Sequence, residues 1–259
     1  MKIYRNTANI KSKDTLGRRF SLAGLLILAL GFVSSFMPSW LPAPMLTFLQ
    51  RYGVLVSFTS LAAGFACASI GSYYINRYAR RRWPDSKTLA RLDEVLERNM
   101  KGFDDKFVYF VHSLPKSNYV VVGPCGILIF AIRGDDGRVV VTGDRWTEPF
   151  SARRLLRIFA REGVGNPPRE LAEQASKLRE FLRQDQTANL GDAPIEGAVV
   201  FINNAAQLEL DSPSVPVLRA DQVKEYIRRK TKEVKLPTST LRALTDYMRE
   251  NSKYQEEQE

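Results

Sequence analysis

The chain has 259 residues, enough for one ordinary domain with additional elements. Its formal net charge of +10 would ordinarily indicate a nucleic acid or an anionic lipid as a partner. Residues 1–83, however, contain eleven Lys and Arg side chains against one acid, Asp14, so the remainder carries 27 basic and 27 acidic side chains. The excess charge gives no support to DNA binding by that remainder. Two cysteines, far apart in sequence, exclude a disulfide framework and a zinc site, and no phosphate-loop pattern occurs.

Two long uncharged segments, Phe20–Gln50 and Tyr52–Asn76, follow the basic N-terminus. Each is long enough to cross a hydrocarbon core of about 30 Å as a helix. Three prolines (Pro38, Pro42 and Pro44) predict a break between them. The alternative for the first segment is a signal peptide, but it lacks a clear small-residue cleavage site and a second span follows. We therefore predict a transmembrane hairpin over residues 20–77, with spans at about 20–40 and 53–76, joined by a connector that includes Arg51.

The basic residues predict the orientation of this hairpin. Six precede the first span, four follow the second, and one lies between the spans. Residues 1–19 are thus expected to form a basic cytoplasmic N-terminus of an integral protein of a bacterial plasma membrane, with both termini and the soluble domain cytoplasmic. No charged side chain lies within either span, so the hairpin is an anchor in the lipid bilayer and not a transport pathway. Small residues of the second span, among them Gly64 and Gly71, suit close helix contact.

The rest of the chain alternates strand and helix patterns, which predicts an α/β core with helices on both faces. Two segments rich in β-branched residues, Asn118–Val122 and Gly126–Ile132, flank a Gly-Pro-Cys-Gly turn. The other predicted strands are Lys106–Ser113, Arg138–Val141, Gly197–Ile202 and Val215–Leu218. The predicted helices run from Asp85 or Ser86 to about Met100, from Asn166 to about Arg183, over Asp221–Arg229 and over Thr238–Tyr254.

Strand alternation places particular side chains on common faces. Asn118, Val120 and Val122 share one face of the first of the two strands, and Ile129, Ala131 and Arg133 share one face of the second. A polar residue that begins one strand and a basic residue that ends the next is the layout of metal-dependent nucleases of the restriction-endonuclease-like class.

The run "NYVVVGPCGILIFAIRGDDGRVVV" resembles the signature of the nuclease-related (NERD) domain, which has a Gly-Pro-x-Gly turn and a later glycine, here Gly123–Gly126 and Gly137. Trp146 and the stretch "NPPRELAEQASKLREFL" from Asn166 are similar to the family's tryptophan and its Asn-Pro helix. The similarity covers roughly residues 87–229. It implies a restriction-endonuclease-like α/β domain over residues 84–235, followed by a C-terminal helix and acidic tail over residues 236–259.

The departures from the family pattern bear directly on activity. Asn118 replaces the metal-binding Asp, Ala131 replaces the Glu, and Arg133 occupies the Lys position. Mg²⁺ prefers carboxylate oxygens, and phosphodiester hydrolysis of this class needs the metal to activate water. Arg and Lys also differ in shape and hydration. The resemblance therefore implies a nuclease fold without metal, cofactor or catalytic residues.

The alternative to an inactive site is that carboxylates from other positions replace the missing metal-binding Asp and Glu. Asp135 and Asp136 lie just past Arg133, although "RGDDGR" is typical of a solvated hairpin turn. Glu170 and Gln174 lie on the Asn-Pro helix, where a solvated helix surface is the simpler interpretation. If the carboxylates of Asp135, Asp136 or Glu170 reached the site, the protein would be an active Mg²⁺-dependent nuclease.

The segment "PFSARRLLRIFAREGVG" predicts an amphipathic helix whose basic face suits anionic headgroups or phosphate. The basic residues are Arg153, Arg154, Arg157 and Arg161, and a solvated surface helix is the alternative. His112, the only histidine, is predicted to be an ordinary strand residue. The sequence thus favours a membrane-anchored, catalytically inactive NERD-domain protein that binds a protein or nucleic-acid partner at the cytoplasmic membrane face. A scaffold that localises a complex is a third hypothesis, and the partner's identity stays open.

Overall fold

A computed structural model describes residues 1–36, 43–84, 88–115, 117–149, 163–185 and 189–254, with the backbone alone for residues 34–36 and 43–50. The chain divides into two compact units. The helical unit comprises residues 11–79. The α/β unit comprises residues 1–10, 80–149 and those from 163 onward.

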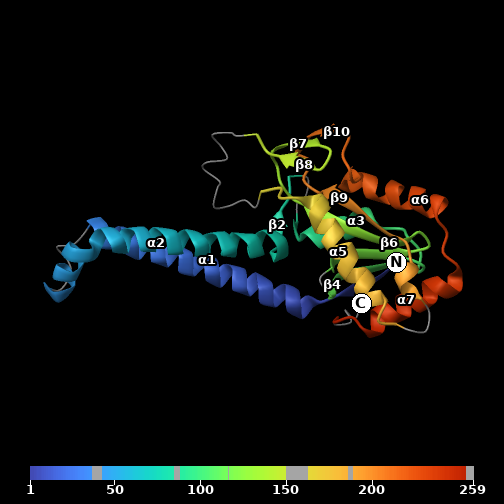
Figure 1. Cartoon of the computed structure of the whole chain (residues 1–259), viewed down its shortest axis with the longest axis horizontal. Coiled ribbons are helices and arrows are strands. Elements are labelled where there is room, and N and C mark those ends of the chain that lie inside the picture. Colours follow the sequence, from blue (N-terminus) through green and yellow to red (C-terminus); the bar gives the residue numbers. More distant parts are fainter. Residues whose placement is uncertain (37–42, 85–87, 116, 150–162, 186–188, 255–259) are drawn as a thin grey trace. The chain divides into compact units, whose positions relative to one another are not determined.

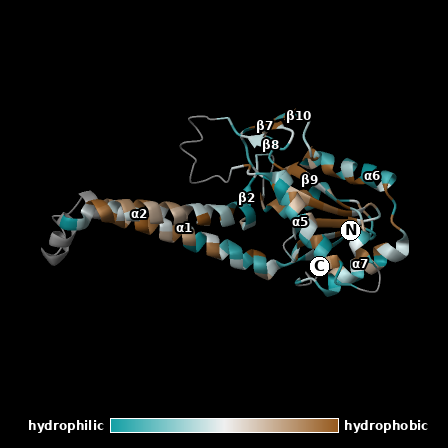
Figure 2. Ribbon diagram, in the orientation of Figure 1, coloured by the Kyte–Doolittle hydropathy of each residue, from teal (hydrophilic) through white to brown (hydrophobic). Residues whose placement is uncertain are grey.

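Two long helices pack as a hairpin, α1 (Thr7–Phe36) and α2 (Ala43–Tyr78) (Figure 1). Their 30 and 36 residues correspond to lengths of about 45 and 54 Å. Large apolar side chains along both helices are exposed, including Leu22, Leu25 and Phe58. Hydrophobic residues cover most of both helices, whereas the start of α1 is hydrophilic (Figure 2). Both helices are therefore long and apolar enough to cross a membrane.

Glycines allow the two helix backbones to approach closely. A Cβ atom at Gly24 would lie 2.7 Å from the backbone nitrogen of Ala68, and one at Gly71 would lie 2.5 Å from that of Ser21. A Cβ atom at Gly64 would meet the side chain of Leu28 at 2.6 Å. The prediction that Gly64 and Gly71 suit close helix contact is thus confirmed, and the contact is made within the hairpin.

Both helices are longer than the predicted spans. The segment 1–19 was expected to precede the first helix, yet α1 begins at Thr7, because the intervening Lys, Arg and Leu residues favour helix. The prediction that Arg51 lies in a connector was wrong, since Arg51 lies inside α2. Pro44 falls in the first turn of α2, where proline is tolerated because the amide lacks an intrahelical acceptor. Charge distribution therefore marks the apolar spans better than it marks the helix ends.

The α/β unit is built on a six-stranded mixed sheet. β4, β5 and β6 run antiparallel in succession, whereas β1, β9 and β11 run parallel to their neighbours. The predicted strands Asn118–Val122 and Gly126–Ile132 are confirmed as β5 and β6. The spatial order of the strands is β1 (Lys2–Arg5), β4 (Val108–Leu114), β5 (Ser117–Gly123), β6 (Gly126–Arg133), β9 (Ile195–Phe201) and β11 (Val217–Arg219).

Helices cover both faces of this sheet, as predicted (Figure 1). One core contains Val120, Ile129 and Ala131 of the sheet together with apolar side chains of α5 (Pro167–Leu182) and α7 (Thr238–Glu250). Arg5 of β1 faces the other way and contacts α3 (Leu92–Asn99), which in turn contacts α6 (Val223–Glu233). A helix therefore crosses over between β6 and the parallel strand β9 on the face that carries Asn118 and Ala131.

The first residues of the chain belong to the sheet. Lys2–Arg5 pair in parallel with Val108–Val111, and the ring of Tyr4 stacks on that of Phe110 at 5.4 Å between centroids. These residues were predicted to belong to a basic cytoplasmic N-terminus over residues 1–19. A four-residue strand in a charged segment carries too little alternation to be recognised. The chain thus begins in the α/β unit, passes through the hairpin and returns to the same unit at Arg80.

Smaller strands complete the α/β unit. β7 (Arg138–Thr142) lies between β10 (Gln207–Asp211) and β8 (Arg145–Thr147) in a three-stranded sheet. β2 (Arg81–Arg82) pairs with β3 (Leu89–Ala90), and α3 begins only at Leu92. Of these strands only β7 was predicted. Because β6 and β7 belong to different sheets, the predicted hairpin turn at "RGDDGR" was wrong: this segment is a connection between sheets.

Candidate functional site

The three departures from the nuclease-related pattern gather at one end of β5 and β6. Val120 pairs with Ile129, and extending that register by two residues brings Asn118 level with Ala131. The Ala131 side chain is 1 % exposed and is part of the core beneath α5. A methyl group in this position offers no ligand to a cation.

Arg133, two residues further along β6, is buried, and each of its three guanidinium nitrogens donates to a protein acceptor. Its Nε donates to the carbonyl oxygen of Val164 at 3.2 Å, and its Nη1 donates to that of Ile132. Its Nη2 forms an ion pair with Oε2 of Glu170 on α5 at 2.5 Å. The guanidinium charge is therefore neutralised inside the protein.

Gln174 extends this pair toward β5. Its side-chain nitrogen donates to Oε1 of Glu170 at 3.2 Å, and its side-chain oxygen accepts from the backbone N–H of Asn118 at 3.3 Å. The two α5 residues are four apart and therefore share a face of the helix. The simpler interpretation of Glu170 and Gln174 as a solvated helix surface was wrong, because this face of α5 packs on the sheet and Gln174 is buried.

His112 contacts Asn118 and lies at the opposite end of these contacts from Arg133. It lies at a register shift in β4, with a φ of 51°, an unusual conformation for a residue other than glycine. Its Nδ1 lies 3.1 Å from Oδ1 of Asn118, and its Nε2 lies 3.2 Å from the hydroxyl of Tyr119. An amide oxygen only accepts, so Nδ1 donates to Asn118, and the direction of the bond between Nε2 and the Tyr119 hydroxyl depends on the tautomer. The prediction of a strand residue is confirmed, since His112 lies in β4, whereas its contact with Asn118 was not predicted.

We call these side chains the polar row: His112, Asn118, Gln174, Glu170 and Arg133. It holds one carboxylate, which is paired with its one guanidinium. Within the described part of the chain, no three His, Cys, Asp or Glu side chains converge as a metal site would require. The charges of Arg133 and Glu170 thus offset each other, and the side chains of Asn118 and Gln174 are uncharged amides.

Asp135 and Asp136 lie beyond the end of β6 and are half-buried. The residue between them and Arg133, Gly134, is fixed by two donors: its carbonyl oxygen accepts from Asn203 Nδ2 at 3.3 Å and from Arg81 Nη2 at 3.4 Å. The predicted basic residues Arg153, Arg154, Arg157 and Arg161 lie outside the described residues.

No protein-family model matches the chain, and neither a curated protein nor a solved structure matches it. The resemblance to the nuclease-related domain therefore rests on sequence residues alone.

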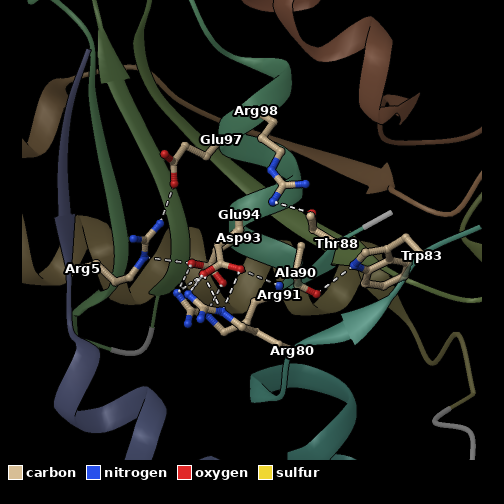
Figure 3. Close-up of polar contacts among 10 residues, drawn as sticks. All are labelled: Arg5, Arg80, Trp83, Thr88, Ala90, Arg91, Asp93, Glu94, Glu97 and Arg98. Carbon is tan, nitrogen blue, oxygen red and sulfur yellow. Dashed lines mark hydrogen bonds and ion pairs between the residues drawn. The ribbon is translucent and has the colours of Figure 1, made fainter. Parts of the chain in front are cut away.

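A second group of charged side chains surrounds α3, on the opposite face of the sheet (Figure 3). Arg5 of β1 donates from Nε to Asp93 at 2.9 Å and from Nη2 to Glu97 at 2.6 Å. Arg5 and Asp93 are both buried, and Arg91 also contacts Asp93 at 3.0 Å. We call this group the α3 ion cluster: Arg5, Arg80, Arg91, Asp93, Glu94 and Glu97.

Arg80, the first residue after the helical unit, joins the same cluster. Its Nη2 lies 2.6 Å from Oε1 of Glu94. Burial acts to raise the pKa of the Glu94 carboxyl, but bonds from Arg80 and from the Arg91 backbone, with both guanidinium charges, hold that pKa below its ordinary value. The α3 ion cluster therefore binds the segment that enters the hairpin and the segment that leaves it. This cluster was not predicted, because Arg5 lies about 90 residues before its partners in the chain.

Proposed function

We propose that this protein is a membrane-anchored, catalytically silent member of the nuclease-related, restriction-endonuclease-like class. In this proposal the hairpin crosses the cytoplasmic membrane, and the α/β unit binds a protein or nucleic-acid partner at the cytoplasmic face. The near-zero net charge outside residues 1–83 favours a protein as the partner.

The main observation in support of a catalytically silent site is the ion pair between Arg133 and Glu170 beside the buried Ala131. A Mg²⁺ ion needs carboxylate oxygens at about 2.1 Å in a near-octahedral shell. Glu170 is the carboxylate of the polar row, and its two oxygens already accept from Arg133 and Gln174. Releasing it for a metal would leave the guanidinium buried without its counter-charge, which is unfavourable.

The path of the chain supports the proposed topology. β1 precedes α1 and Arg80 follows α2, and both belong to the α/β unit. Two membrane crossings return the chain to the side on which it started, so one folded unit can contain both ends of the hairpin. The ten basic residues outside the spans, against one between them, favour the cytoplasm as that side.

A nuclease assay on the purified full chain in detergent tests the silent site. We expect no cleavage of DNA or RNA above the no-protein control with Mg²⁺ or Mn²⁺. Glu170→Gln serves as the site variant, and Glu173→Gln on the same helix serves as its control, because Glu173 pairs with the exposed Arg169. Metal-dependent cleavage that Glu170→Gln abolishes and Glu173→Gln retains would establish the active-nuclease alternative, for which the position of Glu170 beside Arg133 is the one supporting observation.

Membrane insertion is tested separately by alkaline carbonate extraction of cell membranes. We expect the full chain to stay in the pellet. Salt-sensitive retention of the detergent-solubilised protein on DNA would identify a nucleic-acid partner instead of a protein. Release of the protein into the carbonate supernatant would contradict the membrane anchor. The proposal of a silent site would then still be tested by the nuclease assay.

A further inference from the structure

The helical unit contains a groove of about 510 Å³ between α1 and α2. Small-molecule sites in proteins usually have volumes of about 300–1,000 Å³, so this space is large enough for a ligand. The groove is lined by Arg18, Ser21, Leu22, Leu25, Leu28, Ala68 and Ile75.

The lining follows from the way the helices pack. The α1 residues recur at three- or four-residue intervals and therefore form one stripe along the helix. Gly24 and Gly71 allow the two backbones to lie close together, and Gly24 meets α2 at Ala68. Leu22 and Leu25 are 61 % and 64 % exposed, so the apolar side of the groove is open. An elongated apolar chain is the ligand that such a surface suits.

The two polar lining residues, Arg18 and Ser21, precede the leucines along α1, so they mark one end of the groove. The Arg18 side chain is 67 % exposed, and its Nε donates to Asp14 at 3.1 Å. A guanidinium has five N–H donors, so this bond leaves others for a ligand. Asp14 is the one acid in residues 1–83, while Lys11, Lys13 and Arg19 add positive charge nearby in the sequence. The polar end therefore suits an anion.

We propose that this groove binds an anionic glycerophospholipid, with the phosphate on Arg18 and Ser21 at the end near Ile75 and an acyl chain along the leucines and Ala68. The inference rests on the proposed insertion of the hairpin in a membrane. Basic pockets between transmembrane helices on the cytoplasmic side bind anionic headgroups, and arginine forms directional pairs with phosphate. The lipid would be a specific ligand of the anchor, distinct from the bulk bilayer.

Native mass spectrometry of the purified full chain tests this binding. The protein in detergent is offered equal amounts of phosphatidylglycerol and phosphatidylcholine with identical acyl chains. We expect retained phosphatidylglycerol to exceed phosphatidylcholine. Arg18→Gln is expected to lower that preference by on the order of tenfold, as for the loss of one charge-assisted contact. Arg19→Gln removes the same charge one position along the helix but does not line the groove, so it keeps the preference.

Two further variants test the apolar part. Ala68→Leu adds a larger side chain to the groove. Leu25→Ser removes an exposed apolar side chain from its lining. Each variant is expected to lower the retention of phosphatidylglycerol and of phosphatidylcholine. Equal preference in Arg18→Gln and Arg19→Gln, or unchanged retention in both groove variants, would overturn the inference. Carbonate extraction of the same variants separates the two proposals: release into the supernatant contradicts the anchor, whereas a membrane-bound chain with no lipid preference contradicts the lipid site alone.

Discussion

Arg133 shows how a single buried cation determines the character of the polar row. It is nearly inaccessible, and it links the end of β6 to Val164 and to α5. A catalytic lysine or arginine would keep its charge directed toward a substrate. The Arg133 guanidinium is instead paired with the Glu170 carboxylate, so we assign Arg133 a structural role.

The Arg133–Glu170 pair should contribute measurably to stability. Arg133→Met keeps the length of the side chain but leaves Glu170 without its counter-charge, and we expect the free energy of unfolding to fall by about 1.5–3 kcal/mol. Urea unfolding of the detergent-solubilised chain measures this. Arg138→Met is the control, because the Arg138–Glu209 pair is exposed and should contribute little. Equal effects of the two substitutions would show that the burial of Arg133 has no energetic consequence.

Cys125, in the turn between β5 and β6, provides a pH-dependent test. Burial raises the pKa of its thiol, against smaller opposing effects of a bond from Thr231 and of the local backbone. Between the pKa of the unfolded thiol and that of the folded thiol, the folded protein keeps the Cys125 proton and the unfolded chain loses it. The free energy of unfolding should therefore fall as pH rises above the unfolded thiol pKa. Cys125→Ala should remove this dependence. In a Cys67→Ser background, alkylation of the folded protein at about pH 8 should be slower than that of the unfolded chain; equal rates would contradict the burial.

At the scale of elements, the strands with strong local signals were predictable and those that depend on distant partners were not. β5 and β6 combine β-branched residues with a glycine-bounded turn, and Gly126 adopts a φ of 96° that this turn requires. β1 and β10 are short and polar, and they are strands only because β4 and β7 present free edges to them. The predicted degenerate positions do lie together on one face. Gln174 was considered but interpreted as solvated helix surface, since its burial depends on the rotation of α5. The contact of His112 with Asn118 was missed, because it depends on an irregularity in β4.

The hairpin offers an element-scale test of close packing. In Gly24→Ala, the added Cβ would lie 2.7 Å from a backbone nitrogen of α2, so the helices must separate. We expect a loss of about 1–3 kcal/mol, as for overpacking elsewhere, measured by thermal unfolding in detergent. The control is Gly53→Ala, where a Cβ would meet nothing within 4 Å and alanine favours helix by about 1 kcal/mol. A gain of similar size in both variants would indicate an effect of helix propensity alone, and not of helix contact.

For the whole molecule, the path of the chain makes the α/β unit depend on residues from both sides of the hairpin. Residues 1–6 supply the edge strand and Arg5, and Arg80 supplies a further ion pair to α3. A fragment that begins at residue 84 lacks all of these. It exposes the edge of β4 and leaves the buried Asp93 with Arg91 as its remaining partner in the α3 ion cluster.

We therefore expect the fragment 84–259 to be unstable, and a version in which residues 1–6 are joined to Arg80 by a flexible Gly-Ser linker to fold without the hairpin. Removal of one partner of a buried ion pair costs about 3–5 kcal/mol, so Arg5→Met in the linked version should reproduce much of the loss. Urea unfolding of the three proteins measures these differences, and hydrogen exchange of the β4 amides reports on the edge strand. Coincident unfolding midpoints for the linked protein and the fragment would mean that β1 is dispensable. A stable linked protein that loses stability with Arg5→Met would instead show that the hairpin is an insertion between two segments of one folded unit, so that anchor and domain can be altered independently.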